Sequence, residues 1–192
     1  LLVETVESLL GGIPRRGDGP GPLSSLDLCC GSGVIGVSLA ARRTDLECTA
    51  VDLDAEAVSL ARENAAANGV GDRVGCVEAG AADFVRAAAP TYHAIVCNPP
   101  YVPSGDIDRL LPEVKDHEPR LALDGGADGL DFYREVIPLL PRITEPGGII
   151  ALEIGDTQGR LVSELAAAAG FEEVAVRKDY RELDRVVTAR RP

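Results

Sequence analysis

The sequence has no methionine, only two histidines, and no apolar run approaching the ~20 residues that span a bilayer. Without a methionine, we expect the natural start of the protein to lie upstream of Leu1. No basic segment followed by an apolar one opens the chain, so we expect no signal peptide here. We therefore expect a cytoplasmic protein with no membrane segment.

Patterns typical of metal sites and of nucleic-acid binding are also missing. The cysteines are scattered, mostly in apolar stretches, and form no C-x-x-C pair; they are Cys29, Cys30, Cys48, Cys76 and Cys97. This spacing argues against a zinc site and for reduced thiols in a cytosolic core. The formal net charge is −12, whereas a nonspecific nucleic-acid binder carries a basic face. We expect no metal, no nucleic-acid partner and a monomer.

What the sequence does contain is an alternation of short apolar runs with helical patterns. The expected strands are residues 24–30, 46–51, 73–77, 92–97, 148–154, 171–177 and 186–190. The expected helices are residues 1–10, 34–43, 54–68, 81–89, 130–143 and 158–169, with Pro138 and Pro141 interrupting the fifth. Residues 99–129 are expected to be irregular. This order predicts an α/β fold with a mostly parallel sheet covered on both faces.

The chain is 192 residues long and 45% hydrophobic, which suits one domain with a substantial core. Residues 1–22 are expected to form a helix and a Gly/Pro-rich loop, and residues 23–192 the main domain. Polar or small residues follow the first four predicted strands: residues 27–33, Asp52, Gly80 and Asn98. Ligands of such sheets bind beyond the carboxyl ends of the strands, so we expect one site at this edge.

A glycine-rich turn joins the first predicted strand to its helix. It reads GSGVIG from Gly31, and Gly31 and Gly33 let the backbone approach a ligand. Asp52 ends the next strand, where a carboxylate can accept hydrogen bonds from ribose hydroxyls. Together they predict a nucleoside cofactor: NAD, which needs a pyrophosphate cradle, or S-adenosylmethionine, which does not. Asp27 is expected either near a methionyl amino group or bonded to loop amides.

The fourth predicted strand ends in Asn98-Pro99-Pro100-Tyr101. The two prolines have fixed φ and no N–H, so they stiffen the backbone and remove competing donors. The Asn98 side-chain oxygen and the Pro99 carbonyl remain as two acceptors beside the flat ring of Tyr101. Asn-Pro is also a common turn signal. We interpret the four residues as the part of the site that holds a planar –NH2 group, with Asn98 also bordering the cofactor.

Several motifs together resemble the release-factor glutamine methyltransferases, the HemK/PrmC family. They are DLCCGSGVIG, VDLD, NPPYVP, DHEPRLALDGGADGLDFYREV, PGG, and LEIG followed by QG. The resemblance implies a Rossmann-like class I fold, with seven strands and an antiparallel C-terminal hairpin strand. It also implies S-adenosylmethionine as the methyl donor and the glutamine of a Gly-Gly-Gln motif in peptide release factors as the target.

The sequence departs from this family in two places. The family usually has a small helical domain ahead of the catalytic one, and the resemblance here begins directly with the catalytic part. Ala81 and Ala82 stand where the family often has Asp-Trp beside adenine, so no adenine contact is predicted there. His117, Glu118 and Arg120 invite a catalytic interpretation, but the polar groups of a loop that hold the loop itself explain them better, so their roles stay open.

Glu153 is left open between a site role and a structural hydrogen bond. Two other functions also remain open. The first is an adenine-amino methyltransferase of nucleic acid, which shares NPPY but should show a basic groove. The second is a non-catalytic binding module with a methyltransferase fold.

Overall fold

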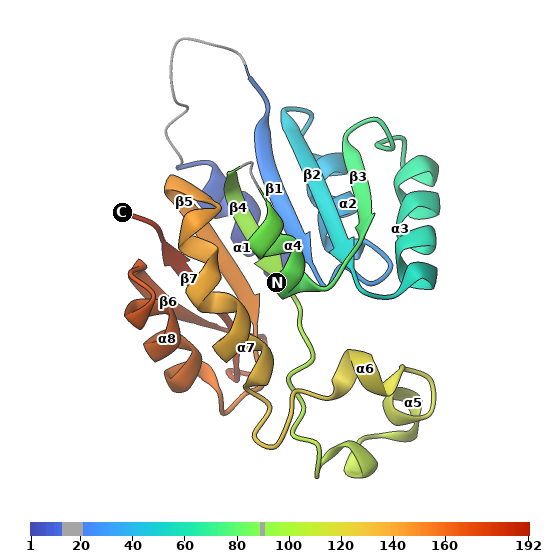
Figure 1. The fold of residues 1–192 in the computed structure, drawn as a ribbon, viewed down its shortest axis with the longest axis vertical. Helices are drawn as coiled ribbons and strands as arrows, with labels where there is room; N and C mark the ends of the chain where they lie inside the picture. Colours follow the sequence, from blue (N-terminus) through green and yellow to red (C-terminus); the bar gives the residue numbers. More distant parts are fainter. Residues whose placement is uncertain (13–20, 89–90) are drawn as a thin grey trace.

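The computed structural model describes residues 1–12, 21–88 and 91–192, which form a seven-stranded sheet between two layers of helices (Figure 1). The strands are β1 (Leu23–Leu28), β2 (Leu46–Asp52), β3 (Val74–Glu78), β4 (Tyr92–Cys97), β5 (Thr144–Glu153), β6 (Glu172–Lys178) and β7 (Asp184–Arg190). The α-helices are α1 (Leu2–Leu10), α2 (Val34–Arg42), α3 (Ala55–Ala67), α4 (Ala81–Ala87), α5 (Pro112–Lys115), α6 (Arg120–Leu123), α7 (Asp131–Val136) and α8 (Gly159–Ala168). Two 3-10 helices are η1 (Ile107–Arg109) and η2 (Ile137–Arg142).

The strand order is β3-β2-β1-β4-β5-β7-β6, and only β7 runs antiparallel to its neighbours. This confirms the predicted α/β class and its antiparallel hairpin strand. β1 pairs with β2 on one side and with β4 on the other, so the direction of chain winding reverses between β1 and β4. Ligands of such sheets bind at this switch point, beyond the carboxyl ends of the two strands.

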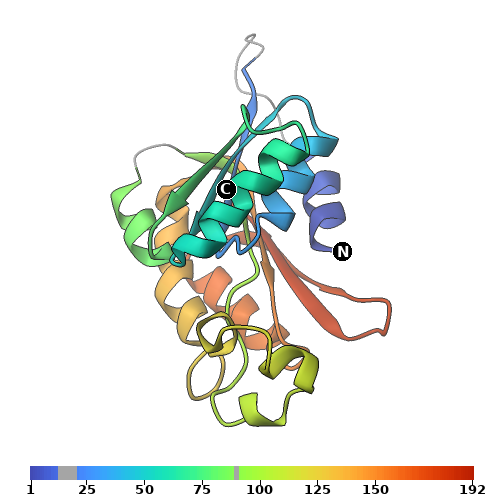
Figure 2. The ribbon, with the colours of Figure 1, turned by 90° about the vertical axis from the view of Figure 1, so that its right-hand side faces the viewer.

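Two groups of helices cover opposite faces of the sheet (Figure 2). α1, α2 and α3 pack on one face, and α1 contributes a row of buried side chains at every fourth position, namely Leu2, Val6 and Leu10. α4, α7, η2 and α8 pack on the other face, around the fully buried Tyr133. Because α1 shares the core with the sheet, residues 1–12 belong to the same packed unit; the boundary at residue 22 stays a prediction.

Most predicted elements agree with the structure to within one or two residues. Asp54 caps α3 by accepting a hydrogen bond from the Glu56 N–H at 2.9 Å, as predicted. The predicted helix 130–143 is split into α7 and η2, because Pro138 and Pro141 cannot donate the hydrogen bonds of an α-helix. Residues 13–20 of the predicted loop and residue 89 of the predicted fourth helix lie outside the described residues.

Two predictions were wrong. β5 begins at Thr144 rather than residue 148, because a bulge separates the pair Tyr92–Thr144 from the pair Ala94–Ile149 and lets the Pro-Gly-Gly segment stay in the strand. The stretch 99–129 is not wholly irregular, since it contains η1, α5 and α6. We call residues 103–128 the strap; Figure 1 shows α5 and α6 beyond the carboxyl ends of β1 to β4.

None of the helices in the described part of the chain is both long and apolar enough to cross a membrane. Across the same residues, no group of three or more His, Cys, Asp or Glu side chains is arranged to hold a metal ion. All five cysteines are free thiols.

Candidate active site

A cavity of about 660 Å³ lies at the switch point of the sheet. Its walls come from the turn after β1, the end of β2, the turn after β3, the end of β4, and the strap. The predicted site residues Gly31, Asp52, Asn98 and Pro100 line it, whereas Asp27, Gly33, Pro99 and Tyr101 do not. The predicted convergence of four strand ends on one cavity is therefore present, although only half of the predicted site residues line it.

Asp52 holds the glycine turn by a hydrogen bond to its backbone. The Gly31 N–H donates to Asp52 Oδ2 at 2.8 Å, and the Asp54 N–H donates to Asp52 Oδ1 at 3.0 Å. Gly31 has φ +53°, and a Cβ there would meet nothing within 4 Å, so its backbone borders open space. Gly33 has φ +77°, and a Cβ there would stand 3.0 Å from that of Ala61, so this glycine serves helix packing.

Asp27 lies beneath the same turn and is fully buried. Its Oδ2 accepts the Gly36 N–H at 2.8 Å, which attaches the start of α2 to β1. Its Oδ1 is buried without a hydrogen-bond partner among the described residues. Burial raises the pKa of Asp27 to about 7, against the lowering effect of the Gly36 N–H. The backbone amide that Asp27 binds therefore lies in α2 rather than in the loop, and the contact to a cofactor amino group stays a prediction.

Asn98 presents its side-chain amide at the cavity wall. The residue is exposed, although β4 before it and Pro99 after it are buried. Within the described part of the chain, no hydrogen bond involves the Asn98 side chain or the Pro99 carbonyl. An exposed polar group held on a stiff, buried segment is free to bind a ligand without first breaking a bond within the protein.

Tyr101 points to the other side of this segment, toward the end of β5. Its hydroxyl donates to Glu153 Oε1 at 3.4 Å, a long hydrogen bond. Burial raises the pKa of both Tyr101 and Glu153, and the nearby Arg185 opposes the rise in each. The Tyr133 hydroxyl donates to the Glu153 carbonyl at 2.6 Å. Three residues after Asn98, which lines the cavity, Tyr101 thus belongs to a second polar group with Glu153 and Arg185.

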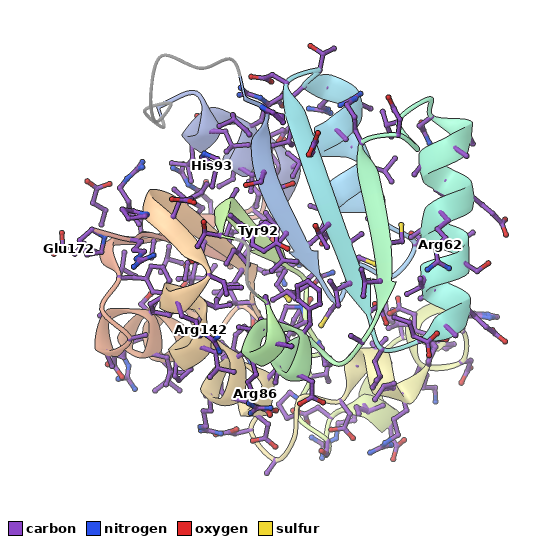
Figure 3. The ribbon with its side chains drawn as sticks, turned by 45° about the horizontal axis from the view of Figure 1, so that its top comes forward. Arg62, Arg86, Tyr92, His93, Arg142 and Glu172 are labelled. Carbon is purple, nitrogen blue, oxygen red and sulfur yellow. The ribbon has the colours of Figure 1, made fainter. Side chains whose placement is uncertain are left out.

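The cavity wall is acidic. The described residues that line it include six carboxylates and no lysine, arginine or histidine; the acids are Asp52, Asp54, Glu56, Asp83, Glu118 and Glu135. Arg86 of α4, labelled in Figure 3, pairs with two of these acids, Asp83 at 3.1 Å and Glu135 at 3.0 Å. In the same view His93 lies toward the opposite, amino end of β4. Such a wall favours a cationic ligand over a phosphate.

Apolar side chains gather around the same cavity. Four of the large hydrophobic residues that are exposed in this structure line it; they are Val34, Leu53, Leu60 and Leu121. They come from α2, the end of β2, α3 and α6, so the strap contributes one of the four. Exposed apolar groups collected from four segments mark a ligand site rather than scattered surface residues.

Several of these residues escaped prediction from the sequence. Leu53 directly follows Asp52 and could have been found from its position after a strand end. Asp83 lines the cavity beside Ala81 and Ala82, although the family pattern places an acid two residues earlier. Glu118 also lines it, whereas Arg120 pairs with Asp124 within the strap at 3.2 Å. No local pattern signals which strap residues face the cavity, because this depends on how the strap folds back.

Comparison with known proteins gives consistent results. The family model for the methyltransferase small domain matches residues 19–114, half of the chain. The release factor glutamine methyltransferase of Caulobacter vibrioides is 44% identical over 165 residues, which is 85% of this chain and 56% of that protein. The protein of the same name from Cereibacter sphaeroides is 43% identical over 167 residues, 87% of this chain and 59% of that protein.

Solved structures match the fold. An O-methyltransferase family protein from Burkholderia thailandensis superposes with a TM-score of 0.67 at 16% identity, over 99% of this chain and 55% of that chain. At that identity the similarity concerns the fold alone. The chain spans less than two thirds of the length of the curated relatives it matches. These relatives confirm the resemblance seen in the motifs, and the chain belongs to the methyltransferase small domain family.

Proposed function

We propose that the chain is the catalytic domain of a release-factor glutamine methyltransferase. It would transfer a methyl group from S-adenosylmethionine to the side-chain amide nitrogen of a protein glutamine, leaving S-adenosylhomocysteine. The observation that carries this proposal is the unpaired, exposed amide of Asn98, which lines an acidic cavity and is followed by two prolines. The names of the relatives support the same reaction.

The cavity residues fit a cationic nucleoside cofactor. Asp52 has two carboxylate oxygens at the end of β2, and each accepts one backbone N–H and retains a lone pair for a ribose hydroxyl. Leu53 and Leu60 supply apolar contact beside it. A pyrophosphate would meet carboxylates and no cation among the described lining residues, which favours S-adenosylmethionine over NAD. When bound, S-adenosylmethionine supplies an electrophilic methyl group on a sulfonium centre.

The residues after β4 account for the choice of an amide nitrogen. Such a nitrogen is a poor nucleophile because its lone pair is delocalised into the carbonyl. Asn98 Oδ1 and the Pro99 carbonyl accept its two N–H bonds, hold the group and favour a tetrahedral nitrogen whose lone pair is free to react. The proton leaves to water once the N–C bond forms, so no general base is required. Orientation and electrostatics are then the main contributions of the protein.

Pro100 and Tyr101 complete the proposed substrate contact. Pro100 lines the cavity and Tyr101 faces Glu153, so the two residues mark the cofactor side and the substrate side of Asn98. A glutamine that extends from a loop can reach this position. The proposed target is the glutamine of the Gly-Gly-Gln motif in a peptide release factor, as the family resemblance implies.

Methyl transfer can be measured with tritiated S-adenosylmethionine and a release factor that carries Gly-Gly-Gln. We expect label on the release factor, and none when its glutamine is replaced by glutamate, because a carboxylate has no N–H for the two acceptors and brings a negative charge to them. The release factor should be present at high concentration, because the chain spans little more than half the length of its relatives and remote contacts contribute to KM.

The other outcomes separate the alternatives. Label that persists on the glutamate variant would refute the assignment of the target. Label on transfer RNA or DNA, with none on protein, would favour an adenine-amino methyltransferase. Binding of the release factor without any transfer would favour a non-catalytic binding module.

A further inference from the structure

A buried glutamine connects three segments around the candidate site. Gln158 lies at the start of α8 and is only 6% exposed. Its Nε2 donates to the Tyr101 carbonyl at 2.9 Å and to the Gly129 carbonyl at 3.1 Å. Its Oε1 accepts the Gly155 N–H at 2.8 Å. Both N–H groups of Nε2 and the oxygen Oε1 therefore have hydrogen-bond partners. If the amide were flipped, Oε1 would lie opposite two carbonyl oxygens and could bond neither of them.

Two glycines, Gly125 and Gly129, allow the backbone to come close enough for these bonds. Gly129 has φ +76°, and a Cβ there would collide with the Tyr101 carbonyl and stand 2.6 Å from Gln158 Nε2. A Cβ on Gly125 would stand 2.8 Å from the Tyr101 Cα. The Gly125 N–H donates to the Val102 carbonyl at 2.9 Å, which brings the two ends of the strap together. Only glycine allows the three segments to approach this closely.

These bonds act on the site from both sides. Tyr101 ends the stiff segment that begins at Asn98, so fixing its carbonyl limits the positions that the Asn98 amide can take. Gly129 follows the strap, whose residues Glu118 and Leu121 line the cavity. Gln158 itself lines no part of the cavity. One side chain therefore fixes the position of the segment from Asn98 to Tyr101 relative to the base of the strap.

We propose that Gln158 is a positioning residue for methyl transfer, acting through the backbone of Tyr101 and Gly129. This inference rests on the proposed function for its effect on turnover, but not for its effect on the strap. Loss of its two donors should displace the Asn98 segment while leaving the glycine turn and Asp52 in place. The expected result is lower kcat with nearly unchanged affinity for the cofactor.

The sharpest variant is Gln158→Glu, which keeps the shape and the acceptor for the Gly155 N–H but loses both donors. At pH 8 its carboxylate would face two carbonyl oxygens. We expect kcat to fall about 10²-fold, the cost of misplacing a reacting group by about 1 Å, while the cofactor Kd from calorimetry stays within about 3-fold. Burial opposite two carbonyl oxygens should raise the pKa of this carboxyl group. As the pH falls toward 6, its protonation restores one donor, and the activity of the variant relative to the wild type should rise. Gln158→Met, which cannot be rescued in this way, should stay low at both pH values.

A matched control separates positioning from general destabilisation. Val162→Ala removes two methyl groups from a fully buried side chain of the same helix without touching the three hydrogen bonds. It should lower the melting temperature yet keep kcat within about 2-fold of the wild type. Equal losses of kcat in Val162→Ala and Gln158→Met would overturn the proposal, as would full activity in Gln158→Glu at pH 8.

Hydrogen exchange tests the inference without any assay of methyl transfer. Gln158→Met should speed exchange of the Val102 and Gly125 N–H groups at least 10-fold, because these bonds close the base of the strap. Val162→Ala should not speed them selectively. If the wild type fails to methylate a release factor but this difference is seen, the proposed function fails and the positioning of the strap stands. Unchanged exchange in Gln158→Met would refute the positioning itself.

Discussion

Replacing Asp27 with asparagine should change how the stability of the protein depends on pH. Asp27 is fully buried, with one oxygen bonded to the Gly36 N–H and the other without a partner among the described residues. Burial raises its pKa from 3.8 to about 7 in the folded protein. The unfolded chain has the ordinary value, so the folded state binds this proton more tightly.

The sign of the effect follows from these two values. The contribution to stability is fully present below pH 3.8 and is lost as the pH rises through about 7. A pKa difference of one unit corresponds to about 1.36 kcal/mol, so Asp27 can contribute at most about 4 kcal/mol to the free energy of unfolding. Between pH 5 and pH 8 the free energy of unfolding should fall by about 2–3 kcal/mol through this group alone. The neutral side chain in Asp27→Asn has no such dependence.

Urea unfolding of both proteins at pH 5, 6, 7 and 8 measures this difference. All other titrating groups are shared, so they cancel when the two free energies are subtracted at each pH. The free energy of unfolding of Asp27→Asn should increase relative to that of the wild type as the pH rises from 5 to 7. Above pH 7 the difference between the two proteins should stay nearly constant. Parallel curves for the two proteins would show that Asp27 is charged in the fold at all these pH values, and the reasoning from burial would be refuted.

Three further substitutions test the site and its support. Asn98→Ala should lower turnover by about 10²–10³-fold while cofactor affinity stays nearly intact, as measured by tritium transfer and calorimetry; activity within a few-fold of the wild type would exclude the two-acceptor grip. Asp52→Ala should weaken cofactor binding by about 1.5–3 kcal/mol in calorimetry, the scale of hydrogen bonds to a charged group, and unchanged affinity would remove Asp52 from the cofactor site. Gly36→Ala should destabilise the fold by about 1–3 kcal/mol in urea unfolding, because its Cβ would stand 2.6 Å from Cys48 Sγ; an unchanged midpoint would mean that α2 shifts freely.

The sheet could be predicted because its strands are short, buried and apolar, and their carboxyl ends carry the polar residues. That pattern was sufficient to place Asp52 and Gly31 at one edge, where they share a hydrogen bond of 2.8 Å. The strap could not be predicted in the same way. α5 and α6 have four residues each, too few to show helical periodicity, and their place over the cavity depends on contacts distant in sequence.

The direction of individual side chains was the harder problem. The sequence predicts Tyr101 as a wall of the amide site but does not indicate that its hydroxyl donates to Glu153, on a strand more than fifty residues later. Gln158 belongs to one of the motifs that carry the family resemblance, but nothing near it in the sequence indicates that its partners are Tyr101 and Gly129. Local pattern fixes which residues end a strand, whereas tertiary contacts decide what those residues face.

The three polar side chains that support the site share one mode of action. Asp27, Asp52 and Gln158 each hydrogen-bond the backbone rather than another side chain: Asp27 bonds α2 at Gly36, and the other two bond loops. A sulfonium donor is already activated, so a site that uses it gains more from fixed geometry than from added charge. Loss of Gln158 should displace the Asn98 segment, so its variants should have a lower kcat. Asp52 can contact the cofactor, so its variants should lose affinity for the cofactor. A site that worked mainly by charge would show the opposite, since replacing Asp52 would then lower kcat at saturating cofactor and replacing Gln158 by the equally neutral Met would not.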